Sequence, residues 1–153
     1  MIHANPEIEL IISAAGDSAK ELNHEYVTLE HLLKALIEYK PFNDMLRNFG
    51  VDVDLMVGDV RRYLDNHSQI VSKDIDHNPK KTHALERVFN RALTQVLFSG
   101  RQQMQIIDIF ISLTAENNSH AAWFIMRSGI DREKLVEFYK HNYDSEGKHR
   151  KNA

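Results

Sequence analysis

The strongest constraint on the fold is an internal repeat that relates the two halves of the 153-residue chain. A shift of 77 residues aligns Thr28 with Gln105 and places apolar residues opposite apolar residues on both sides of this pair. Farther along, the shift grows to 79, and the phrase Gly50-Val51-Asp52 returns as Gly129-Ile130-Asp131. In each phrase we expect the glycine to end one helix and the aspartate to cap the next. The sequence therefore predicts two copies of one unit.

Apolar residues recur at steps of three and four through both halves, which is typical of helices that bury one face. Asn5-Pro6 reads as a helix start, with a capping side chain followed by proline at the first helical position. No run alternates in the way of a strand. The fold predicted is all-α, with eight helices arranged as two pseudo-two-fold related four-helix repeats. The other expected helix caps are Thr28, Asp52, Thr82, Ser119 and Asp131.

These elements define the expected domain organisation. Residues 1–143 form one double-repeat domain, with repeat 1 at about 6–66 and repeat 2 at about 82–143. Residues 67–81 are polar and lack a period, so they are expected to be a linker, and residues 144–153 a flexible polar tail. We expect the first helix of each repeat to pack against the other in a shared core.

Composition excludes several functions. The chain has no cysteine, which removes disulfide and thiolate chemistry and is compatible with a reducing compartment. The formal net charge of -3 gives no reason to expect nucleic acid or an anionic membrane as a partner. No apolar run approaches the length of a membrane span, and the N-terminus lacks the order of a signal peptide. The expected location is the cytoplasm.

The helix start at Thr28 lies within a specific motif. Residues 24–36 read HEYVTLEHLLKAL, which resembles the H-x-(aromatic or apolar)-V/M-T-x-E-H-L-L-x-A-L signature of the Clp N-terminal repeat. In the second half, the run 87–92 (RVFNRA), followed by Ser99-Gly100-Arg101, resembles the matching stretch of the ClpA type. The resemblance covers about residues 6–143.

This resemblance implies a peripheral domain that is mounted on the AAA+ rings of a protein unfoldase. There it would receive unfolded or N-degron substrates and, in the ClpA type, dock the adaptor ClpS. The chain contains no G-x-x-x-x-G-K-[S/T] phosphate loop, and no nucleophile elbow or cysteine nucleophile. We therefore expect no enzyme activity and no cofactor here, with ATP hydrolysis outside this chain.

The resemblance also assigns three candidate binding residues. In ClpA-like domains, the acids at the positions of Glu25 and Glu30 and the threonine at the position of Thr82 face the ClpS adaptor. An ordinary structural interpretation stands beside this one: Glu25 is then a solvated loop acid, and Glu30 an acid that complements the dipole of the helix it begins. The two interpretations are compatible.

Other polar residues give weaker signals. The nine histidines are mostly isolated, and a structural metal usually needs four protein ligands, so no metal site is predicted. His24 near an acid such as Asp65 is the one exception considered, and His31 is expected to pack or hydrogen-bond at the repeat interface. Trp123 and Phe124 are adjacent on one helix and cannot both face inward, so one can offer an apolar surface to unfolded clients.

Two other functions remain open at this stage. The chain can be a free-standing regulator that carries only this domain and competes for adaptors. It can also be a ClpC-like domain, which would use paired acids and basic pockets to recognise a phosphoarginine-type degradation signal.

Overall fold

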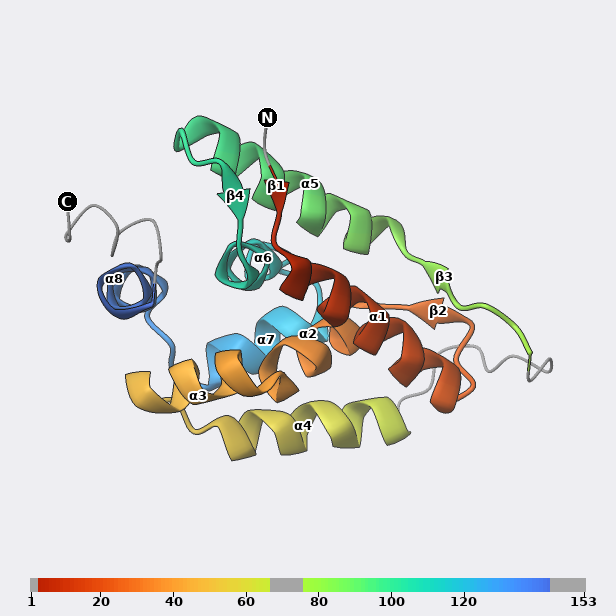
Figure 1. The fold of residues 1–153 in the computed structure, drawn as a ribbon. Helices are drawn as coiled ribbons and strands as arrows, with labels where there is room; N and C mark the ends of the chain where they lie inside the picture. The colour runs from red at the N-terminus through yellow and green to blue at the C-terminus, as the bar shows by residue number, and fades with distance from the viewer. Residues whose placement is uncertain (1–2, 67–75, 144–153) are drawn as a thin grey trace.

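A computed structural model of the chain describes residues 3–66 and 76–143 (Figure 1). Within these residues it contains the eight predicted helices, four in each repeat, so the all-α double repeat is confirmed. The tail at 144–153 and linker residues 67–75 lie outside the described part. The first repeat comprises β1 (His3–Ala4), α1 (Pro6–Glu21), β2 (Tyr26–Val27), α2 (Leu29–Glu38), α3 (Lys40–Phe49) and α4 (Val53–Asn66). The second comprises β3 (Lys80–Lys81), α5 (His83–Phe98), β4 (Gln103–Met104), α6 (Ile106–Leu113), α7 (His120–Arg127) and α8 (Arg132–Asn142).

The repeated Gly-apolar-Asp turn has the predicted geometry in both copies. Gly50 has φ 106° and Gly129 has φ 78°, a left-handed conformation that side chains disfavour. The side chains of Asp52 and Asp131 each accept a hydrogen bond, at 3.1 Å, from the amide three residues further on. These contacts explain why α4 and α8 both begin directly after the turn.

Four two-residue strands, which the sequence does not predict, exchange partners between the repeats. β1 pairs with β4 and β2 pairs with β3, both in parallel. A shift of 77 residues maps β1 onto β3 and β2 onto β4, so each repeat donates its leading strand to the internal strand of the other. This exchange follows the predicted pseudo-two-fold relation. It also corrects the expected linker, because its last two residues, 80 and 81, form β3.

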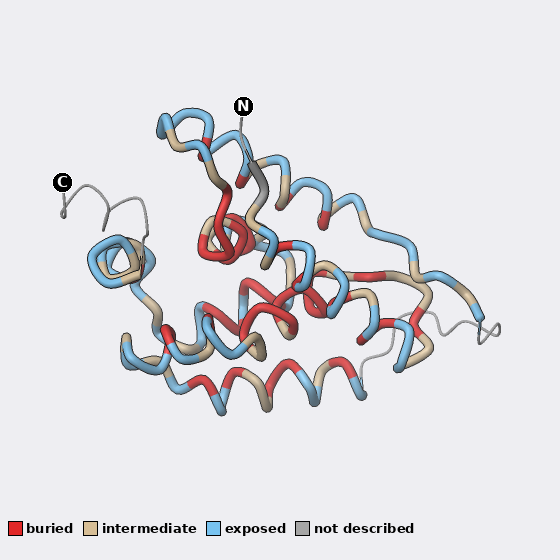
Figure 2. Tube along the Cα trace, viewed as in Figure 1, coloured by how far each residue is buried: buried red, intermediate tan, exposed pale blue. Residues whose placement is uncertain are grey.

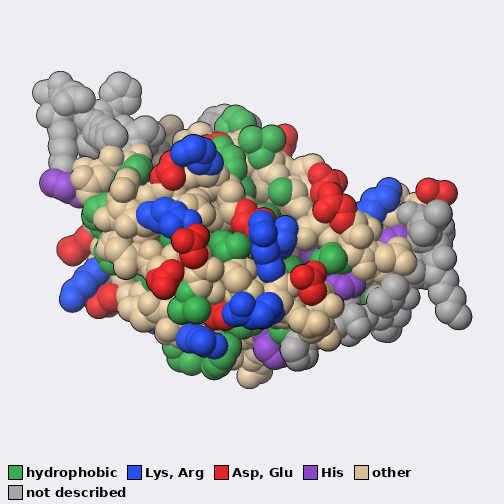
Figure 3. Space-filling model, turned by 90° about the horizontal axis from the view of Figure 1, so that it is seen from below, with side chains coloured by type: hydrophobic (Ala, Val, Ile, Leu, Met, Phe, Trp, Pro, Cys, Tyr) green, Lys and Arg blue, Asp and Glu red, His purple; other side chains and the backbone are tan. Residues whose placement is uncertain are grey.

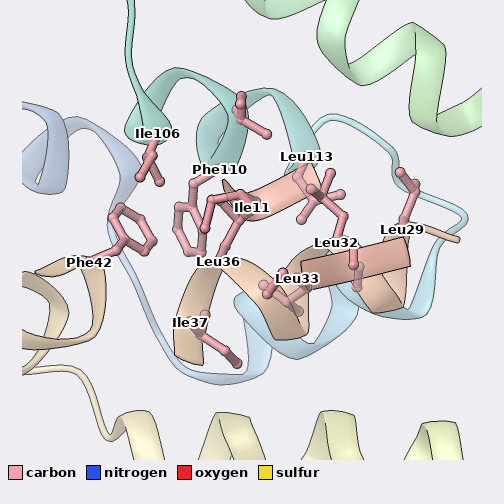
Figure 4. Close-up of a cluster of buried hydrophobic side chains, with 14 of the residues drawn as sticks. Ile11, Leu29, Leu32, Leu33, Leu36, Ile37, Phe42, Ile106, Phe110 and Leu113 are labelled. Carbon is pink, nitrogen blue, oxygen red and sulfur yellow. The ribbon is translucent and has the colours of Figure 1, made fainter. Parts of the chain in front are cut away.

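The shared core lies around α2 and α6. Figure 2 shows the buried residues concentrated along α2, α6 and α7, and Figure 4 shows apolar side chains of α2 and α6 directed toward one another. The rings of Phe42 and Phe110 meet edge to face, with centroids 5.1 Å apart. The expectation that the first helices, α1 and α5, pack against each other is wrong. The repeats join mainly through α2, which packs on α6 and α7, while α1 and α5 cover the outside.

The two repeats differ in the placement of their last helix. In the first repeat, α4 packs closely along α2. In the second, α8 lies away from α6 and makes its main helix contact with α3 (Figure 1). Leu135 is the one fully buried residue described on α8. The pseudo-symmetry is therefore broken at α8.

The surface carries both signs of charge. Seen from the side of α4 (Figure 3), lysine and arginine side chains alternate with aspartate and glutamate. In the part of the chain that the structure describes, no helix has the length and apolar character to cross a membrane.

Candidate functional site

The candidate site is built on the corner between α1 and α2. Helix α1 ends at Glu21 with Leu22 as its C-cap, and Asn23 adopts a left-handed conformation with φ 59°, which asparagine tolerates better than most residues. The amide of His24 then donates to the carbonyl of Ala19 at 2.8 Å. This reversal directs the chain back along α1 and into β2.

Pairing between β2 and β3 brings two of the three predicted site residues together. The amide of Lys80 donates to the carbonyl of Glu25 at 2.9 Å, and the amide of Thr82 donates to the carbonyl of Val27 at 3.3 Å. Glu25 and Thr82 therefore flank one short parallel ladder that joins the two repeats. Both residues are partly exposed. Among the described residues, no hydrogen bond or ion pair is formed by the Glu25 carboxylate.

Thr82 also caps helix α5. Its hydroxyl accepts a hydrogen bond from the amide of Leu85 at 3.3 Å. This fixes the threonine side chain at the helix start, where the first-turn amides of α5 point outward. The predicted capping role of Thr82 is confirmed.

Glu30 lies in a different environment from Glu25. Its side chain is buried, and its Oε2 accepts a hydrogen bond from the amide of Ala121 at 2.9 Å. This amide belongs to the first turn of α7, so the carboxylate of one repeat complements a helix N-terminus of the other. The 77-residue shift places Ile107 at the equivalent position, so the second repeat has no matching acid.

A buried pair of histidines supports the corner from beneath. The amide of Thr28 donates to Nδ1 of His31 at 3.0 Å, so this nitrogen accepts and the ring proton lies on Nε2. Nε2 of His31 lies 3.0 Å from Nδ1 of His24 and donates a hydrogen bond to it. The predicted hydrogen-bonding role of His31 is confirmed, although its partners lie within the first repeat. A third histidine, His77, donates from Nε2 to the carbonyl of His24 at 2.7 Å.

Burial favours the neutral form of both rings of the pair. Burial, together with the charges of His24 and Lys34, lowers the pKa of His31 to about 4. Burial also lowers the pKa of His24, against the opposing effect of the Asp65 carboxylate. Protonating either ring would remove an acceptor on which the corner depends.

A shallow hollow adjoins Thr82. It measures about 360 Å³ and lies between the starts of α2 and α5 and the loop from α6 to α7. Arg87 and Glu116 form an ion pair at 2.7 Å on its wall, and the apolar lining can receive a side chain of a bound protein. The apolar lining residues are Leu29, Ala84 and Ala115.

Sequence reasoning missed the strand ladder and His77. A two-residue strand is too short to show a period, and Lys80 and Lys81 stand within a polar stretch. Among the described residues, no group of three or more histidines and acids is placed to hold a metal ion. Trp123 is partly exposed, whereas Phe124 beside it is buried, as their adjacency predicts.

Comparison with known proteins assigns the class. The profile of the Clp repeat (R) N-terminal domain matches residues 4–127, and the chain belongs to this family of protein-binding modules of Clp ATPases. The resemblance to the ClpA type is supported by a "ClpA homolog protein" of Fuscovulum blasticum, 30% identical over 135 residues. This match covers 88% of the chain and 17% of the relative, so the chain spans about a sixth of the relative's length.

Solved structures show the same fold. The Hsp104 N-terminal domain from Candida albicans has a TM-score of 0.73 at 13% identity, with 90% of this chain and 89% of that chain covered. A ClpV N-domain in complex with a VipB peptide has a TM-score of 0.65 at 21% identity, with 86% and 81% covered. At these identities the likeness concerns the fold.

Proposed function

We propose that this chain docks a ClpS-type adaptor of the N-degron pathway for a ClpA-like ATP-dependent unfoldase, in the cytoplasm. The observation that carries the proposal is the β2–β3 ladder, which joins the two repeats and has Glu25 at one end and Thr82 at the other. The ClpA homolog supports this choice of partner. ATP hydrolysis would belong to a larger protein that contains this domain. The ClpA homolog, for comparison, is about six times as long as this chain.

The chemistry of this surface suits a polar interface. The unpaired Glu25 carboxylate can accept charge-assisted hydrogen bonds from a lysine or hydroxyl of the adaptor. At the other end of the ladder, Thr82 begins α5, and the hollow near this helix start offers apolar surface. A polar rim next to an apolar recess is the usual arrangement of protein interfaces.

Glu30 would contribute to the same surface indirectly. Its hydrogen bond to Ala121 fixes the start of α7, and Ser119 just before it lines the hollow. A charge reversal at Glu30 would place a buried lysine against a helix N-terminus and disturb the fold. Tests of docking therefore belong at Glu25 and Thr82.

The experiment is calorimetric titration of the domain with a purified ClpS-type adaptor. The double variant Glu25→Lys/Thr82→Arg should bind at least about tenfold more weakly, since it reverses one charge and blocks the helix start. Thr82→Ala removes the same cap without adding bulk, so it separates loss of the cap from obstruction of the surface. Unchanged affinity in a folded double variant would rule out this surface, and no binding by the parent domain would rule out the adaptor.

The other candidate functions gain less support. The ClpC-like alternative calls for paired acids, and the equivalent of Glu30 in the second repeat is Ile107. A free-standing regulator would use the same adaptor surface. The site therefore does not distinguish such a regulator from the N-terminal domain of a longer unfoldase. Direct binding of unfolded or N-degron substrates remains part of the proposal, because a ClpV N-domain of the same fold is known with a bound VipB peptide.

A further inference from the structure

The displacement of α8 opens a second cavity, far along the chain from the adaptor surface. This cavity measures about 300 Å³ and lies between α5, α6 and α8. The 79-residue shift shows how α8 differs in sequence from α4. It aligns Arg132 and Tyr139 of α8 with Val53 and Val60 of α4, and both valines are fully buried against the first repeat. Arginine and tyrosine are larger and more polar than valine, and on α8 both line the cavity.

The cavity is held open by a specific contact. The hydroxyl of Tyr139 donates to Oε1 of Gln105, the residue that precedes α6. Gln105 is buried, and this bond links α8 to the start of α6 without closing the space between them. The cavity is therefore preformed, and binding there would cost little rearrangement.

Its lining combines an apolar floor with a cationic rim. Two of the rim cations are neutralised, because Arg91 pairs with Glu116 at 2.6 Å and Arg101 pairs with Asp108. Arg132 donates to the hydroxyl of Thr114 at 3.2 Å, and neither Arg132 nor Lys140 pairs with a carboxylate of the described residues. The floor consists of Ala92, Ile107, Ile111, Ala115 and Val136.

We propose that this cavity binds an acidic segment of a client or partner protein, with an apolar side chain in the cavity and neighbouring carboxylates on Arg132 and Lys140. A free anion would leave the apolar floor without a partner, and an uncharged apolar segment would leave the two cations without one. A segment with both features satisfies the floor and the rim together. Ala115 lines both this cavity and the hollow near Thr82, so the two sites adjoin. The proposal nevertheless does not depend on the adaptor proposal.

The test uses fluorescence anisotropy with three labelled peptides on the intact chain. One peptide has leucine flanked by glutamates, the second has the glutamates replaced by lysine, and the third has the leucine replaced by serine. The first should bind saturably, and more weakly as salt is added. The double variant Arg132→Glu/Lys140→Glu should lower its affinity about tenfold, since two attractions become repulsions.

A matched control lies on the same helix. Lys134 is exposed on α8 and does not line the cavity, so Lys134→Glu makes a comparable change of charge on the same helix outside the cavity lining. It should leave the affinity within about twofold. The proposal is overturned if the first peptide does not bind, if it binds no better than the other two, or if Lys134→Glu weakens binding as much as the double variant does. Amide NMR shifts on addition of the peptide should occur at Ile107 and Ile111, and shifts confined to the Thr82 surface would also overturn it.

Discussion

At the scale of single residues, the two glutamates of the α1–α2 corner differ in the surroundings of their carboxylates. Glu25 has a partly exposed carboxylate with no partner among the described residues, whereas Glu30 is buried on the amide of Ala121. The sequence places Glu25 in a loop and Glu30 at a helix start, but it does not show that Glu30 is buried against the second repeat. The distinction depends on α7, which lies 90 residues further along and reaches Glu30 only through the tertiary fold.

Removal of the Glu30 carboxylate should destabilise the fold. Glu30→Ala leaves a buried helix-start amide without an acceptor, so we expect the free energy of unfolding to fall by about 1–3 kcal/mol. Glu25→Ala should change it by less than about 0.5 kcal/mol, because no described residue pairs with that carboxylate. Urea denaturation of both variants measures this difference, and equal effects would contradict the assigned role of Glu30.

The histidine pair should make stability depend on pH. His31 has a pKa of about 4 in the folded chain and an ordinary value of 6.5, so below pH 6.5 the unfolded chain binds more protons at this site. Stability from this group is complete above pH 6.5 and is lost as the pH falls toward 4. The expected loss is about 1.4 kcal/mol per pH unit for each such histidine.

Denaturation at a series of pH values tests this prediction. His31→Asn should be less stable at pH 8 and should show a flatter pH profile between pH 7 and 5. His83→Gln is the control, since the side chain of His83 is exposed, and it should follow the parent profile. A His31→Asn profile parallel to that of the parent would show that this ring does not control the dependence.

At the scale of elements, helices and turns followed from the sequence much better than strands did. The three- and four-residue periods located all eight described helices, and the glycine-aspartate phrase located two helix boundaries. The strands escaped because each has two residues and derives its pairing from the other repeat. A short strand of this kind is defined by its partner and not by its own side chains.

Two glycines should respond to substitution with opposite signs. Gly129→Ala places a side chain at φ 78°, so it should cost about 1 kcal/mol. Gly16 lies inside α1 with nothing near an added Cβ, so Gly16→Ala should stabilise by about 0.5–1 kcal/mol through helix propensity. Thermal unfolding of the two variants measures both, and a stabilised Gly129→Ala would contradict the proposed role of this turn.

At the scale of the whole molecule, two exceptions to the repeat symmetry matter most. The two-copy arrangement of eight helices was predicted from the aligned halves, whereas the exchanged strands and the α2–α6 core were not. The acid at Glu30 without a counterpart, and the tilt of α8, depend on single departures between the copies, such as Arg132 in place of Val53. Those departures can be read from the alignment once it is made, but the cavity that they open also depends on how α8 packs on α3.

The adaptor surface is the central claim, and NMR mapping tests it most directly. An isotopically labelled domain would be titrated with an unlabelled ClpS-type adaptor, and the amide shifts followed residue by residue. We predict shifts and line broadening at Glu25–Leu29 and at Thr82–Glu86, on the two sides of the β2–β3 ladder, with little change along α8. Shifts centred on α8 and the cavity beside it, or no shifts at saturating adaptor, would contradict the account.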